Sequence, residues 1–170
     1  MKGDLHTLKR ICEYASKVML GGEVVLGVVL AATVVLAACS LFSDGAADVL
    51  HDLIGLGKPC DLASVSALLE VVVILLMALF TVWTVYSLMI SIMREHSPFN
   101  EPNTNAVILI SKVYLACSVV LAVLSVLADG GLTETLFLFF GCVLIGVVLY
   151  CFALVIRYGA VLQDESDHTL

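Results

Sequence analysis

Four long apolar segments dominate this chain of 170 residues, at positions 24–42, 68–93, 106–128 and 136–156. Glu70 and Lys112 are the charged residues within them. An α-helix rises about 1.5 Å per residue, so roughly 20 apolar residues cross the ~30 Å hydrocarbon core of a bilayer. Each segment is long enough to do so. The sequence therefore predicts an all-α, polytopic membrane protein with four transmembrane helices in an antiparallel bundle.

The composition agrees with this prediction and limits the function. Hydrophobic residues make up 61% of the chain and charged residues 14%, whereas about a quarter of an average soluble protein is charged. The polar remainder is too small for a conventional soluble catalytic domain, so we expect one transmembrane domain over residues 1–170. Phosphate-binding, dinucleotide-binding, zinc-protease and serine-hydrolase motifs do not occur. We expect no enzyme activity, no catalytic or metal-binding residues, no cofactor and no direct nucleic-acid binding.

The positions of the basic residues favour one orientation in the membrane. Cytoplasmic segments of membrane proteins carry an excess of Lys and Arg. With a cytoplasmic N-terminus, seven of the eight basic residues lie on the inner side and Lys58 on the outer. The seven are Lys2, Lys9, Arg10, Lys17, Arg94, Lys112 and Arg157. We therefore expect a cell-membrane protein in contact with lipid, with both termini and the tail 157–170 in the cytoplasm and the loop 43–66 outside.

The N-terminal segment 1–23 is basic and amphipathic. Apolar positions such as Leu5, Leu8 and Cys12 recur at helical spacing. Such a helix either lies on the inner leaflet among anionic headgroups or extends the first span into the cytoplasm. The sequence leaves both alternatives open.

Cys39 and Cys60 leave two further questions open. Leu36, Ala37 and Ala38 before Cys39 have the form of a lipidation motif, although three more spans follow it and favour ordinary packing of this cysteine. Cys60 lies in the outer loop, so a Cys39–Cys60 disulfide is a second alternative. In the same loop Asp48, His51 and Asp52 cluster, and we interpret them as the solvated edge of a short helix rather than a metal site.

Two spans carry polar stripes at helical periodicity. The stripe of the second span is Thr81, Thr84, Ser87 and Ser91, and that of the third is Ser111, Tyr114, Ser118 and Ser125. We interpret these hydroxyls chiefly as hydrogen-bonding groups between or within helices, each interhelical bond contributing about 0.6 kcal/mol. The alternative is a polar path for a solute between spans two and three.

Ionisable and small residues predict contacts between spans. Glu23 and Lys112 lie at similar depth, which makes a structural ion pair one interpretation, while the other is that the Lys112 ammonium extends to the interface. Small residues also favour close helix packing in membranes. We expect contact faces at Gly27, Ala31 and Ala38 in span one and at Cys142, Gly146 and Ala153 in span four.

Two motifs resemble one known family. Ser97-Pro98-Phe99-Asn100 precedes the third span, and Arg157-Tyr158-Gly159 followed by the run from Leu162 to Leu170 closes the chain. Together they resemble the YoaS-like family of small four-span prokaryotic membrane proteins, which carry a domain of unknown function. The residues that carry the likeness are Pro98, Phe99, Asn100, Gly159, Leu162, Gln163, Glu165, Ser166 and Asp167. The outer loop with Cys60 has no counterpart in the pattern.

The resemblance implies a partner but no catalytic residues. Members are often encoded beside a small Cro/CI-like helix-turn-helix regulator, so it implies such a cytoplasmic protein as a partner. We also expect the acidic tail, with Asp164, Glu165 and Asp167, to lie near the basic N-terminal segment and form a docking surface with it. The function that we predict is a non-enzymatic, partner-binding or regulatory membrane protein. The alternative is a small transporter or channel subunit, which needs homo-oligomerisation to enclose a path.

Overall fold

The computed structural model describes residues 2–54, 61–95 and 101–168, and these ranges are helical apart from short turns. The five helices are α1 (Lys2–Ser40), α2 (Asp44–Ile54), α3 (Leu62–Glu95), α4 (Glu101–Leu127) and α5 (Leu132–His168). Four of them, all except α2, are long and apolar enough to cross a membrane. The predicted all-α fold with four membrane-spanning helices is confirmed. α1 runs unbroken through Gly21 and Gly22, so the N-terminal segment continues the first span as one helix.

The side chain of Asp61 explains where α3 begins. The backbone N–H of Ser64 donates to Asp61 Oδ1 at 3.3 Å, which satisfies one of the free N–H groups of the first helical turn. This hydrogen bond holds the pKa of the Asp61 carboxyl below its ordinary value. At the start of α4, Pro102 occupies the first turn, where a missing N–H is tolerated.

The turn between α4 and α5 is a left-handed helix cap. Asp129 has a positive φ of 56°, a conformation that Asp and Asn tolerate better than most residues. The N–H of Gly130 donates to the Ser125 carbonyl at 2.9 Å, which closes a Schellman-type motif. A Cβ at position 130 would stand only 2.7 Å from that carbonyl oxygen, so glycine is required there. This compact turn makes α4 and α5 an antiparallel hairpin, as the sequence predicts.

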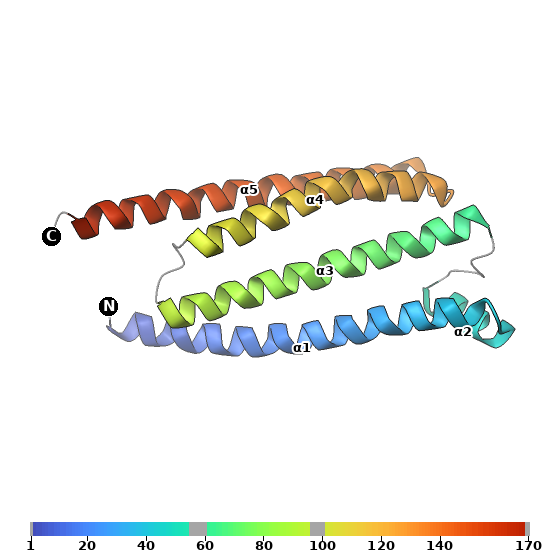
Figure 1. Ribbon diagram of the computed structural model, residues 1–170, viewed down its shortest axis with the longest axis horizontal. Helices are drawn as coiled ribbons and strands as arrows, with labels where there is room; N and C mark the ends of the chain where they lie inside the picture. The colour runs from blue at the N-terminus through green and yellow to red at the C-terminus, as the bar shows by residue number, and fades with distance from the viewer. Residues whose placement is uncertain (1, 55–60, 96–100, 169–170) are drawn as a thin grey trace.

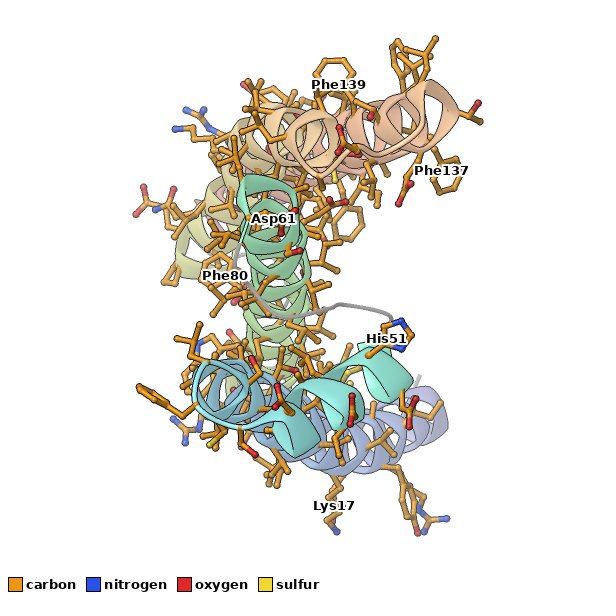
Figure 2. The ribbon with its side chains drawn as sticks, turned by 90° about the vertical axis from the view of Figure 1, so that its right-hand side faces the viewer. Lys17, His51, Asp61, Phe80, Phe137 and Phe139 are labelled. Carbon is orange, nitrogen blue, oxygen red and sulfur yellow. The ribbon has the colours of Figure 1, made fainter. Side chains whose placement is uncertain are left out.

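The four long helices pack as an open row in the order α1, α3, α4, α5 (Figure 1). α4 packs most extensively against α5, α3 packs against α1 and α4, and the short α2 packs against the end of α1. In the parts of the chain that the structure describes, α1 has no packing contact with α4 or α5. Figure 2 looks down the long axes of the helices and shows α3 between α1 and the α4–α5 pair.

The bundle has two ends along the axes of its long helices. The terminal end holds the beginning of α1 and the end of α5, and the far end holds α2 and the α4–α5 turn (Figure 1). The expected meeting of the acidic tail with the basic N-terminal segment does not occur, because α1 and α5 are the two outermost helices of the row. α3 and α4 separate them.

Each packing face follows a repeat of alternating three- and four-residue steps, as in helices that pack side by side. On α1 the buried residues are Cys12, Ser16, Thr33, Ala37 and Ser40. The contact face expected at Gly27, Ala31 and Ala38 is therefore wrong at two of its three positions, whereas Gly27 is half-buried. Ala31 and Ala38 are exposed, and a Cβ at Gly27 would meet nothing within 4 Å. On α5 the expected face is correct at its two most buried positions, Gly146 and Ala153.

Candidate functional site

The hydroxyl stripe of α4 is turned toward α5. Ser111, Ser118 and Ser125 recur every seven residues and are no more than 1% exposed. Ser125 Oγ and Thr135 Oγ1 of α5 are 3.0 Å apart and share a hydrogen bond. A Cβ at Gly146 of α5 would lie 3.3 Å from the backbone oxygen of Ser111, so the two helices approach closely there. These serines are small residues at a tight helix–helix contact, the role that small polar residues commonly have in membranes.

One hydrogen bond does join the two predicted stripes. Thr81 Oγ1 of α3 and Tyr114 Oη of α4 are 2.9 Å apart. Thr81 donates its own hydrogen to the Met77 carbonyl at 2.7 Å, so the Tyr114 hydroxyl is the donor to Thr81. The bond ties α3 to α4 at mid-length.

The remaining hydroxyls of the two stripes differ in their hydrogen bonds and in their burial. Thr84 is buried and donates to the Phe80 carbonyl at 2.8 Å. Ser118 donates to the Leu115 carbonyl at 2.7 Å. Ser87 and Ser91 are half-buried, whereas Ser111 Oγ is buried without a hydrogen-bond partner. Three of the eight stripe hydroxyls, those of Thr81, Thr84 and Ser118, therefore donate to carbonyls of their own helix.

The space between the described parts of α3 and α4 is apolar. A groove of about 390 Å³ does lie between α3 and α4. Its walls are apolar, and they are Val73, Leu76, Met77, Phe80, Val113 and Cys117. Such a surface offers no hydrogen-bond partners to water and no ligands to ions, so it is unfavourable for both. The sequence shows which hydroxyls share one side of each helix, but it does not show which neighbouring helix that side faces.

Glu23 and Lys112, the residues of the predicted ion pair, are not brought together. Glu23 lies on α1 and Lys112 on α4, and α3 separates these helices in the row. Lys112 is exposed. Glu23 is half-buried, and its Oε2 atom is buried without a hydrogen-bond partner. The prediction of a pair is wrong because similar depth does not imply neighbouring helices. Among the described side chains, the ion pair is instead Glu13 with Lys17, at 2.9 Å within α1.

A second groove, with charge on its walls, lies at the far end between α3 and α5. It has a volume of about 420 Å³. From α3 it is lined by Ala67, Glu70, Val71 and Ile74, and from α5 by Glu134, Phe137 and Leu138. The sequence analysis did not predict this groove, since it gave Glu70 no contact with another span. The signal was the placement of two glutamates near the same end of two different spans.

Only some of the cysteine and family-like residues named from the sequence lie in the described parts of the chain. Cys39 carries a free thiol, and Cys60, the other residue of the proposed disulfide, lies outside the described residues. Pro98, Phe99 and Asn100 also lie outside them. Gly159 and Leu162 lie on α5, and the backbone of Gln163, Glu165, Ser166 and Asp167 continues the same helix. No group of three or more His, Cys, Asp or Glu side chains suitable for a metal occurs in the described ranges.

No family model, curated protein or solved structure matches this chain.

Proposed function

We propose that this chain is a non-enzymatic protein of the cell membrane that binds a cytoplasmic partner through the end of α5. The observation that carries this proposal is the length of that helix. Val107 of α4 packs with Ala153 and Ile156 of α5. α4 begins at Glu101, six residues before Val107, whereas α5 continues twelve residues past Ile156 to His168. In an antiparallel pair, the α5 backbone after Leu162 therefore projects past the start of α4, by about 9 Å at 1.5 Å per residue (Figure 1).

The projecting turns are strongly acidic. They contain Asp164, Glu165 and Asp167, and no Lys or Arg follows Arg157 in the chain. The distribution of basic residues supports a cytoplasmic position for this end. A rigid acidic helix that ends in the cytoplasm attracts a protein with a basic surface, and long-range charge accelerates such an encounter.

The resemblance to the YoaS-like family suggests a partner with that property. Helix-turn-helix regulators carry Lys and Arg on the face that contacts DNA phosphates. We propose such a regulator as the partner. An acidic helix that occupies its basic face would compete with DNA and hold the regulator at the membrane.

Capture of a purified helix-turn-helix regulator by the full-length chain in nanodiscs tests this proposal. We expect the triple variant Asp164→Asn, Glu165→Gln, Asp167→Asn to reduce capture about ten-fold or more at 0.1 M salt, where the Debye length is about 10 Å. The matched control is Asp48→Asn, Asp52→Asn, Glu134→Gln, which removes the same charge at the far end. Equal capture by the two variants would refute the proposed surface.

The alternative is a small transporter or channel subunit, for which the apolar lining of the groove between α3 and α4 gives no support. It required an aqueous path between the stripes of α3 and α4, and the groove between these helices is apolar. Thr84 and Ser118, which were to line the path, are buried and donate to their own helix carbonyls.

A further inference from the structure

The groove between α3 and α5 combines two unlike surfaces. Ala67, Val71 and Ile74 form an apolar wall on α3, and Phe137 and Leu138 form one on α5. Two carboxylates, of half-buried Glu70 and exposed Glu134, face the same space. Phe137 and Phe139 point to opposite sides of α5 (Figure 2). Phe137 belongs to this groove, whereas Phe139 lines a different one against α4.

The two carboxylates have no positive partner in the described structure. Glu70 is on α3 and Glu134 is on α5, and both line the same groove. The described Lys and Arg residues lie in the terminal half of the molecule, on the first half of α1, the end of α3, the first half of α4 and the last turns of α5. His51 of α2 is at the far end but does not line the groove. Two like charges beside an apolar surface repel each other, and a cation placed between them removes the repulsion.

The chemistry of the walls favours an organic cation over a metal ion. Ca²⁺ needs six to eight oxygen ligands and Mg²⁺ an octahedral shell. Here the polar wall residues are two glutamates, and the rest are aliphatic or aromatic. A zwitterionic lipid is also a poor fit, because its phosphate would stand beside two carboxylates. An amphipathic monocation suits both surfaces, and the face of Phe137 adds a cation–π contact.

We propose that this groove is a binding site for a soluble amphipathic organic cation. Its ammonium group lies between Glu70 and Glu134, and its apolar body lies against Val71, Ile74 and Phe137. The site is at the opposite end from the partner-binding helix end. A failure of the partner-binding proposal would therefore leave the proposal of this cation site unchanged, and the reverse also holds.

Equilibrium binding of benzyltrimethylammonium to the full-length protein in phosphatidylcholine nanodiscs tests the proposal. The control ligand is the neutral carbon isostere neopentylbenzene, which has the same shape without the charge. We expect saturable binding of the cation that is at least ten-fold tighter than that of the isostere. Exposed ion pairs contribute up to about 1 kcal/mol, so each of Glu70→Gln and Glu134→Gln should weaken binding of the cation up to about five-fold, and the double variant more than either.

The matched control is Asp48→Asn, Asp52→Asn, which removes two charges from α2 at the same end, away from the groove. It should leave binding within about two-fold, because the added screening of a distant charge is small. Thermal unfolding of each variant shows that the fold is kept. Non-saturable binding, equal binding of the isostere, or unchanged binding in the Glu70→Gln, Glu134→Gln double variant would overturn the proposal. So would competition by phosphatidylcholine, which would make the occupant a lipid.

Discussion

Gly146 provides the sharpest test of the packing between α4 and α5. A Cβ at this position would lie 3.0 Å from Leu115 Cγ, 3.1 Å from Leu115 Cδ2 and 3.3 Å from the Ser111 carbonyl oxygen. Ordinary carbon contacts are about 3.5–4.0 Å. A Gly146→Leu substitution would therefore need displacement of Leu115 or of the α4 backbone before the rest of its side chain is placed.

The cost can be estimated from the contacts involved. Overpacking a close contact destabilises by about 1–3 kcal/mol. Separation of the helices would also weaken the Ser125–Thr135 hydrogen bond, worth about 0.6 kcal/mol on average. We expect Gly146→Leu to lower the free energy of unfolding by about 2–4 kcal/mol relative to a matched control. Gly141→Leu is that control, because a Cβ at Gly141 meets nothing within 4 Å and the gain in helix propensity is the same.

Both variants would be measured by steric trapping or by reversible unfolding in mixed detergent micelles. The difference between them isolates the close approach of α5 to α4. If Gly146→Leu is as stable as Gly141→Leu, the tight contact at Ser111 and Leu115 does not exist, and the reasoning from the seven-residue repeat of serines is wrong.

Three further predictions follow from single contacts. A double-mutant cycle of Thr81→Val and Tyr114→Phe should give a coupling energy of about 0.6 kcal/mol in unfolding measurements, and zero coupling would contradict the bond between α3 and α4. Glu23→Leu should raise the free energy of unfolding by about 1 kcal/mol because it removes a buried, unpartnered oxygen. Lys112→Leu, at an exposed position, should change the free energy of unfolding little. A loss of stability in both variants would instead support the ion pair between Glu23 and Lys112. Because the folded state lowers the pKa of Asp61, its contribution to stability is present above the ordinary value of 3.8 and is lost as the pH falls through the lowered one. The difference in stability between the unaltered chain and Asp61→Ala should therefore narrow on acidification, and a pH-independent difference would contradict the cap.

The number of apolar helices long enough to span a membrane could be predicted, because length and lack of charge are local properties of the chain. The α4–α5 hairpin could also be predicted, since Asp129 and Gly130 determine the turn. So could the contact at Gly146 and Ala153, where small residues coincide with the packing repeat.

The choice of neighbours could not be predicted in the same way. In a membrane, the faces toward lipid and toward other helices are both apolar, so no contrast in hydrophobicity marks the packed side. That is why Ala31 and Ala38 were assigned to the contact face of α1 in place of Thr33 and Ala37. It is also why the alternative of a polar path requires Ser111 and Ser125 to face span two, although they face α5. The groove at Glu70 and Glu134 depends on the order of helices in the row, which no local pattern encodes.

The most direct test of the central claim is the membrane topology of the intact chain in cells. Epitope tags would be placed at each terminus and within the segment 55–60, and their accessibility to antibody would be compared before and after permeabilisation. Four crossings with both ends in the cytoplasm predict that the internal tag is accessible in intact cells and that both terminal tags require permeabilisation. Terminal tags on opposite sides, or recovery of the chain in the soluble fraction, would contradict the account.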